Sequence, residues 1–224
     1  MDLDLSSVPV TFWRPDCVDI LKDKDAIFRF NRYWRILAGK AIAKFLLCKK
    51  INVEPFNPND IDTMWRIHDI YMEELKELLH EKDDDEIERW YKSRHVEDNN
   101  LLKLKRDIAW AMLTNCRFCE RLCGVNRIEG KLGFCQLNSN ARIASVFIHV
   151  GEEPELVPSF TIFFSRCNFK CVYCQNWDIS QRTTGMTIPP IELAITIEKR
   201  WNSNEIRNVN WGWWRPRPQH TLYI

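Results

Sequence analysis

Residues 161–174, TIFFSRCNFKCVYC, decide how the rest of this sequence is interpreted. The apolar run from Phe160 to Ser165 predicts a β-strand. Directly after it come Cys167, Cys171 and Cys174, separated by three and two residues. A loop of this kind can turn three soft thiolates toward one centre, as iron–sulfur clusters require. Three ligands would leave one iron of a four-iron, four-sulfur cube open to a substrate or cofactor.

The segments around this loop predict an α/β fold. Upstream, residues 142–150 are rich in Ile, Val and Phe, and a turn at residues 151–154 separates them from the next strand. Downstream, Pro189 and Pro190 open an apolar-periodic helix of about residues 190–201, which a strand at residues 206–211 follows. The order strand, loop, helix, strand indicates the beginning of a βαβ unit with a parallel sheet.

Residues 1–115 predict a helical N-terminal region without a catalytic constellation. Residues 26–50 have basic and apolar side chains at helical intervals, which indicates an amphipathic helix whose basic face the acidic run at residues 81–86 can neutralise. A second helix is expected to begin near Asp60, and a third to end near Asn115. His68 lies on the apolar face of the second helix and is expected to be a core histidine.

Four more cysteines form a cysteine-rich segment at residues 116–140. Cys116, Cys119, Cys123 and Cys135 supply enough thiols to close a tetrahedral zinc site or to hold a second iron–sulfur cluster. The spacing implies a metal without deciding which one. Cys17 and Cys48 stand alone and are expected to be small core hydrophobes. The predicted domains are therefore the helical region at 1–115, this metal-binding knuckle at 116–140, and an α/β domain at 141–224.

Composition limits the cellular location and the classes of binding partner that we expect for this chain. The chain has 224 residues, 32 basic against 31 acidic side chains and a net charge of +1, which offers no electrostatic footprint for nucleic acid or an anionic membrane. The first residues lack the basic start and apolar stretch of a secretory signal, and no window is apolar enough for a membrane span. We expect a cytoplasmic protein, in which the 9 cysteines stay reduced.

The three-cysteine motif resembles that of the radical S-adenosylmethionine (radical SAM) enzymes. The resemblance implies a 4Fe-4S cluster on Cys167, Cys171 and Cys174, whose open iron chelates the methionine part of S-adenosyl-L-methionine. It also implies reductive cleavage of that cofactor to a 5'-deoxyadenosyl radical, with ferredoxin or flavodoxin as the reductant. Tyr173 matches an aromatic position that lies against the adenine in family members, and ordinary packing beside the loop is the equal alternative.

A closer resemblance covers about residues 113–211. The strings CRFC at 116–119, CGVNR at 123–127, GKLGFC at 130–135, GEEP at 151–154 and CQNWDISQ at 174–181 are similar to those of the uncharacterised relatives of pyruvate formate-lyase activating enzyme. This resemblance implies a partial (βα) barrel, with the cluster loop after its first strand. It also implies activation of a protein or modification of an unknown substrate.

The end of the sequence departs from that family. A Gly-Gly-Glu or Gly-Gly-Asp motif is expected after the second barrel strand, where this chain has Trp211-Gly212-Trp213-Trp214-Arg215-Pro216-Arg217. Two Trp codons, an AGA codon and a Pro codon spell Gly-Gly-Asp one base later, so we expect a frameshift and a catalytically incomplete chain. The alternative for these residues is an aromatic and cationic binding tail.

A noncatalytic zinc-binding module is the alternative for the whole chain. In that case the three downstream cysteines would hold structural zinc, with Cys135 or His149 as a fourth ligand. Closed zinc sites are commonly built from pairs of cysteines two residues apart, so the three-cysteine loop directly after a strand favours the radical SAM interpretation. His149 is expected to be a packed or edge residue of its strand.

Overall fold

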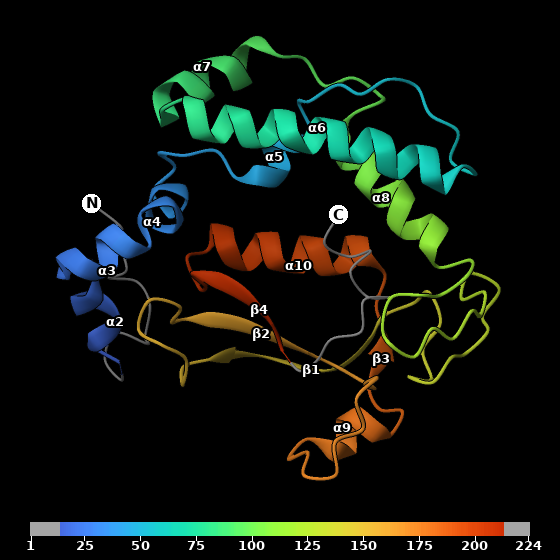
Figure 1. The fold of residues 1–224 in the computed structure, drawn as a ribbon. Coiled ribbons are helices and arrows are strands. Elements are labelled where there is room, and N and C mark those ends of the chain that lie inside the picture. The colour runs from blue at the N-terminus through green and yellow to red at the C-terminus, as the bar shows by residue number, and fades with distance from the viewer. Residues whose placement is uncertain (1–13, 213–224) are drawn as a thin grey trace.

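The computed structural model describes residues 14–212, which form a mixed α/β fold with helices first and a sheet second (Figure 1). The first part contains short helices, a long helix and two helices that pack against it. These are α2 (Asp16–Asp19), the 3-10 helix η1 (Ile20–Lys22), α3 (Lys24–Arg29), α4 (Asn31–Leu37), α5 (Lys44–Cys48), α6 (Ile61–Glu81), α7 (Asp84–Ser93) and α8 (Leu101–Met112). The second part contains β1 (Arg142–His149), β2 (Ser159–Phe164), α9 (Trp177–Gln181), β3 (Met186–Thr187), α10 (Pro190–Asn202) and β4 (Asn208–Gly212).

The single helix expected over residues 26–50 is wrong. The segment divides into α3, α4 and α5, and Gly39, with φ of +66°, lies just beyond the end of α4. The expected neutralisation of its basic face does occur. Arg32 and Arg35 both pair with Asp84, which belongs to the acidic run. One carboxylate shared between two guanidiniums connects α4 to the start of α7.

The remaining helices of the first part begin where their capping residues predict. The Asp60 side chain accepts a hydrogen bond of 3.1 Å from the Thr63 amide and starts α6. Asp83 and Glu86 form a capping box, so the acidic run is a helix boundary, and it starts α7. These helices enclose a core whose buried members are Leu47, Cys48, Ile51, Val53, Met64, Ile67, Leu75, Leu78, Ile87, Leu101, Leu104 and Ile108.

Individual residues of this part match their predictions with one exception. Both ring nitrogens of His68 have partners, at 2.9 Å from Asp69 and 2.9 Å from Lys105, as expected of a core histidine. Cys17 and Cys48 are buried. Helical spacing predicts Trp65 on the apolar face of α6 with His68, whereas the structure exposes it at the border of a surface pocket.

The sheet has the strand order β3-β1-β2-β4. β2 and β4 are parallel, with Ser159 opposite Asn208 and Phe163 opposite Gly212, and α10 connects them. The predicted βαβ unit is therefore confirmed. β1 pairs antiparallel with both β2 and β3, so the sheet is mixed and open.

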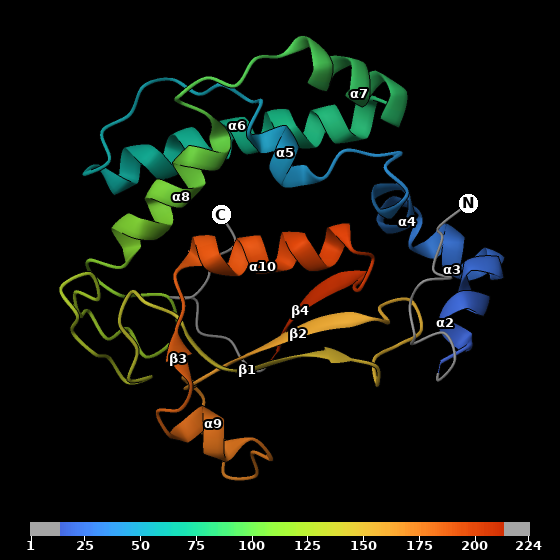
Figure 2. The same ribbon diagram turned by 180° about the vertical axis from the view of Figure 1, so that it is seen from behind.

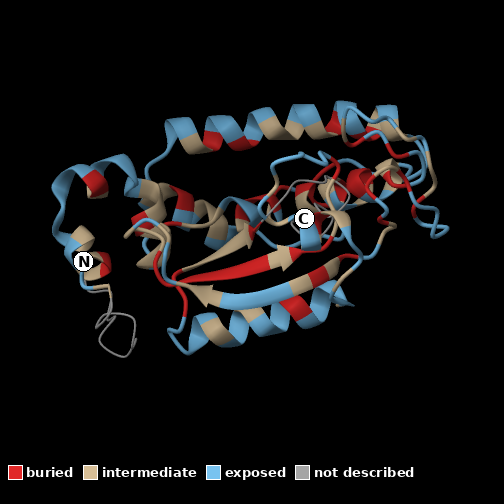
Figure 3. Ribbon diagram, turned by 90° about the horizontal axis from the view of Figure 1, so that it is seen from below, coloured by how far each residue is buried: buried red, intermediate tan, exposed pale blue. Residues whose placement is uncertain are grey.

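The sheet buries one face against α10. Phe160, Ile162 and Phe164 of β2 form this core with Leu193 of α10 and Ile206. Figures 1 and 2 show α10 lying along the sheet. Figure 3 shows that β2 is buried over most of its length, whereas the middle of β1 is exposed.

The N-terminal helices α2 to α4 lie beside the end of the sheet that is opposite β3 (Figures 1 and 2). Arg207, which directly precedes β4, is buried there. Its guanidinium donates to the carbonyl oxygens of Cys17 at 2.9 Å and Pro154 at 2.8 Å. The Tyr33 hydroxyl donates to the Glu155 carbonyl at 3.1 Å. These contacts join α2 and α4 to the loop between β1 and β2.

The C-terminal segment is described only as far as β4. Trp211 lies in that strand, and its ring stacks on Phe164 with centroids 5.8 Å apart. Trp213, Trp214, Arg215 and Arg217 of the expected binding tail lie outside the described residues. Between residues 14 and 212, no helix has both the length and the apolar character that a bilayer crossing requires.

Candidate metal and cofactor site at the cysteine loops

The loop with Cys167, Cys171 and Cys174 leaves the carboxyl end of β2. Because β4 runs parallel to β2, both strands end at the same edge of the sheet. In α/β proteins this edge is where ligands bind. Figures 1 and 2 show the loop and α9 projecting from the sheet. The fold therefore places the three cysteines at the edge where a cofactor site is expected.

The base of this loop is closed by a set of hydrogen bonds. The Arg166 amide donates to the Ile179 carbonyl at 2.7 Å, and the Arg166 side chain donates to the Thr183 hydroxyl at 2.8 Å. The Ser165 hydroxyl donates to the Arg182 carbonyl at 3.2 Å and accepts from the Thr184 amide at 3.0 Å. The two ends of the loop are thus held together.

Backbone and side-chain donors surround the sulfur atoms of the loop. The Phe169 amide donates to Cys167 Sγ at 3.4 Å, and Cys174 Sγ lies 3.4 Å from the Ser180 hydroxyl. Burial raises the pKa of the Cys167 thiol, although the amides of Phe169 and Lys170 act in the opposite direction. Cys171 is exposed. A bound metal ion would take the place of the thiol proton of Cys167 and would stabilise the ionised sulfur despite its burial.

Tyr173 lies on the outside of the loop. Its side chain is 87% exposed, and the neighbouring Val172 is fully exposed. The Tyr173 ring is thus largely open to solvent within the described residues. The ring is free to stack on a bound ligand.

The knuckle holds its four cysteines in a second set of bends. The Cys116 amide donates to the Val125 carbonyl at 3.1 Å, and the Gly124 amide donates to the Cys116 carbonyl at 2.9 Å. The Phe134 amide donates to Cys123 Sγ at 3.3 Å. Cys116 and Cys135 are buried, and Cys119 and Cys123 are half-buried.

Arg127 is buried among these thiols, which sequence reasoning missed. Its side chain is 1% exposed and donates to the Leu137 carbonyl. Burial opposes the charge on Arg127, yet a hydrogen bond with Cys116 and the neighbouring Cys135 outweigh it, so its pKa is raised overall. A Cβ at Gly133 would lie 2.5 Å from the Arg127 side chain, so a larger residue there would displace the guanidinium. A buried cation requires nearby negative charge, which metal-bound thiolates would supply.

Left-handed backbone gathers at the cysteines of both groups. Leu122, Gln136, Arg166 and Lys170 have φ between +41° and +75°, and each adjoins a cysteine in sequence. Non-glycine residues rarely adopt this conformation, and it persists where the surroundings impose it, often at ligand sites. In each group one backbone amide donates to a cysteine sulfur, from Phe134 to Cys123 and from Phe169 to Cys167.

The donor chemistry of both groups fits a soft metal centre. Each group offers several thiols, N–H donors aimed at sulfur, and strained bends that carry the cysteines. Over residues 14–212, no three Cys, His, Asp or Glu side chains already lie close enough together to hold a metal ion. The residues that would hold a cluster in the loop are Cys167, Cys171 and Cys174, and the residues that would hold a metal in the knuckle are Cys116, Cys119, Cys123 and Cys135.

His149 is in the wrong place to complete the loop site. It pairs with Ser159 at the start of β2, whereas the loop follows Phe164 at the other end of that strand. Five residues of strand separate the two ends by about 17 Å. His149 lies 3.3 Å from Glu152 instead and is a partly exposed residue at its end of the sheet. Of the two fourth ligands considered for zinc, the fold therefore excludes His149.

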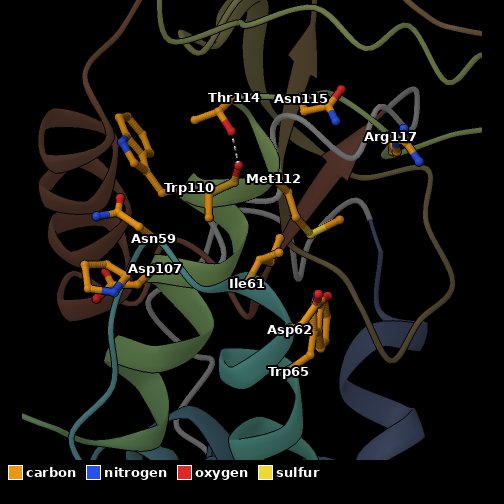
Figure 4. A pocket seen from close by; sticks show the side chains of 12 residues that line it. Asn59, Ile61, Asp62, Trp65, Asp107, Trp110, Met112, Thr114, Asn115 and Arg117 are labelled. Carbon is orange, nitrogen blue, oxygen red and sulfur yellow. Dashed lines mark hydrogen bonds between the residues drawn. The ribbon is translucent and has the colours of Figure 1, made fainter.

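The helical region carries a separate open pocket of about 760 Å³ between the start of α6 and the end of α8 (Figure 4). Trp65, Trp110, Asp62 and Asp107 line it, with Arg117 at the side of the knuckle. The Thr114 hydroxyl donates to the Ala111 carbonyl at 2.7 Å at this rim. No spacing pattern predicts this pocket, because its lining comes from two helices that are distant in the sequence.

Comparison with known proteins gives one curated relative. The chain is 39% identical over 203 residues to an uncharacterized protein of Methanocaldococcus jannaschii. The match covers 88% of this chain and 56% of the relative, so the chain spans about half the length of that relative. No family model matches the sequence, and no solved structure matches the chain.

Proposed function

We propose that this chain is an iron–sulfur protein of the radical SAM type. Cys167, Cys171 and Cys174 would hold three irons of a 4Fe-4S cluster, and the fourth iron would bind S-adenosyl-L-methionine. The observation that carries the proposal is the position of this motif. It leaves the carboxyl end of the first of two parallel strands, in a loop with left-handed bends and an amide aimed at sulfur.

Cys167, Cys171 and Cys174 would hold the cluster, which when bound would supply the electron for reductive cleavage of S-adenosyl-L-methionine and so the means to take a hydrogen atom from a substrate. The chain's own residues position the parts. The hydrogen bonds of Ser165 and Arg166 hold the loop on the sheet, and exposed Tyr173 would stack on the adenine. Ferredoxin or flavodoxin would be the reductant.

We also propose that β2, α10 and β4 begin a (βα) barrel. By strand alternation, Thr161, Asn208 and Asn210 point away from α10. Near the start of the two parallel strands this face is polar, since the Ser159 hydroxyl donates to Asn208 at 2.8 Å and Asn210 donates to Glu152 at 2.8 Å. Beside it the rings of Phe147 and Phe163 stack with centroids 5.5 Å apart. The Thr161 hydroxyl is buried without a partner. A polar inner face fits a barrel that receives a polar ligand better than it fits a two-layer core. The substrate, a protein or a smaller molecule, would be received there.

The knuckle would hold zinc or a second cluster on its four thiols. A closed site fits its burial, since Cys116 and Cys135 are nearly inaccessible to solvent. The proposal places the protein in the cytoplasm, where thiols stay reduced. If the loop also held only zinc, the chain would be the noncatalytic module considered as the alternative.

Anaerobic reconstitution with ferrous iron and sulfide tests the proposal. We expect a brown protein that, under reduction, cleaves S-adenosyl-L-methionine to methionine and 5'-deoxyadenosine. The triple variant Cys167→Ala, Cys171→Ala, Cys174→Ala should lose this cleavage, whereas Cys48→Ala, at a thiol buried in the helical core, should keep it. A colourless wild-type protein that binds only zinc would refute the radical SAM assignment and support the zinc module.

A further inference from the structure

The ring of Phe134 contacts two cations, one from each of the two cysteine segments. The Arg121 guanidinium carbon is 4.0 Å from the centroid of the Phe134 ring, and Lys170 Nζ is 4.5 Å from it. Cations at these distances from an aromatic ring are attracted by its electrons. The ring therefore joins the knuckle to the cluster loop, although Phe134 and Lys170 are far apart in the sequence.

Each of these three residues lies one or two positions from a cysteine in the sequence. Arg121 lies between Cys119 and Cys123, and Phe134 directly precedes Cys135. The Phe134 amide also donates to Cys123 Sγ at 3.3 Å. A shift in the knuckle cysteines must therefore move the ring.

The contact with the Phe134 ring reaches the cluster loop at a residue with left-handed backbone. Lys170 directly precedes Cys171 and has φ of +55°, a conformation disfavoured for lysine. The Arg121 side chain also donates to the Asn168 carbonyl at 3.4 Å, inside the same loop. The knuckle thus supports the backbone between the first two cluster cysteines at two places.

Charge explains why the contact would depend on metal. Arg121 and Lys170 repel each other across one ring, and neither has a carboxylate partner among the ion pairs of the described residues. Thiolates bound to metal in both groups would supply negative charge beside the two cations. The arrangement is therefore most stable when both groups are loaded.

We propose that Phe134 is a positioning residue through which metal in the knuckle holds the loop in its cluster-binding conformation. The proposal rests on the assignment of a cluster to Cys167, Cys171 and Cys174. Loading of the knuckle strengthens cluster binding in the loop and thereby slows loss of iron, and by linkage a bound cluster raises the affinity of the knuckle for its metal.

A double-mutant cycle in the full chain tests this proposal. The measured quantity is the rate at which reconstituted protein, also supplied with zinc, loses iron to a chromophoric chelator, together with the electron paramagnetic resonance spectrum of the reduced cluster. Phe134→Leu and Cys119→Ser should each speed iron loss about tenfold, as expected from losing two cation–π contacts. The double variant should also lose iron about tenfold faster, because both changes break one link.

Two further variants control for folding. Phe56→Leu removes a ring that Lys103 approaches to 4.6 Å in the helical region, and it should leave the rate unchanged. Lys170→Met changes an exposed side chain and should speed iron loss severalfold even if Phe134→Leu fails to fold. A Phe134→Leu rate equal to wild type, or a double variant about a hundredfold faster, would overturn the coupling. A wild type that binds no iron would instead defeat the function proposed above, before any variant is compared.

Discussion

The Arg207 guanidinium donates a hydrogen bond of 2.9 Å to the carbonyl oxygen of Cys17, across 190 positions of sequence. The same guanidinium donates to the Pro154 and Glu155 carbonyls. Burial lowers the pKa of Arg207, yet its hydrogen bonds to three carbonyls hold it in place. One buried side chain therefore joins α2, the loop before β2, and the start of β4.

Replacing Arg207 by Met should destabilise the chain by about 3 kcal/mol, because three carbonyls, among them that of buried Cys17, lose a charged donor. Arg29→Met removes an exposed pair with Asp25 and should change stability by less than about 0.5 kcal/mol. Urea unfolding followed by circular dichroism measures both. Equal stability of the two variants would show that Arg207 does not join these segments.

Gly185 should tolerate no side chain. It has φ of +69°, and a Cβ there would lie 1.9 Å from the Ile143 carbonyl oxygen in β1. We expect Gly185→Ala to cost about 3 kcal/mol and to loosen the cluster loop, whose end Gly185 follows. Gly130 is the matched control, since it also has positive φ but has open space around it.

Gly130→Ala should therefore cost only about 1 kcal/mol. Thermal unfolding of both variants gives the comparison. If the two glycines proved equally tolerant, the close approach of residue 185 to β1 would be wrong.

The stability of the helical region should depend on His68 in mildly acidic solution. Burial lowers the pKa of this imidazole below its ordinary value of 6.5, and Lys105 acts in the same direction while Asp69 opposes it. As the pH falls below that value, the unfolded chain takes up a proton that the folded ring resists, so stability falls.

His68→Gln should therefore lose less stability than wild type between about pH 7 and pH 5. His80→Gln, at an exposed histidine near the end of the same helix, should behave as wild type. Urea unfolding across this range gives the comparison. Parallel pH profiles for His68→Gln and wild type would contradict the burial of His68.

The sequence predicted the parts of the fold that local patterns determine. Asp60, a capping residue, predicted the start of α6. The apolar run before Cys167 predicted β2, and the helix after Pro190 predicted the crossover to parallel β4. In each case the signal lies within a few residues of the element.

Other features could not be predicted because distant segments determine them. The basic segment at 26–50 breaks into three helices whose arginines turn toward Asp84. Arg127 resembles a surface residue in sequence, and only the folded knuckle surrounds it with thiols. Phe134 meets Lys170 only because the knuckle packs against the loop. The spacing of the cysteines identified both groups, but it did not predict that the knuckle and the cluster loop contact each other.

The central claim is an open iron held by Cys167, Cys171 and Cys174. Electron paramagnetic resonance of anaerobically reconstituted, reduced protein tests it directly, with and without S-adenosyl-L-methionine. We predict a 4Fe-4S signal that changes when the cofactor is added, and we expect this cofactor-dependent change to disappear in the triple alanine variant of the loop. A signal that is indifferent to the cofactor, or a cofactor-dependent change that survives the loss of those three thiols, would contradict the claim.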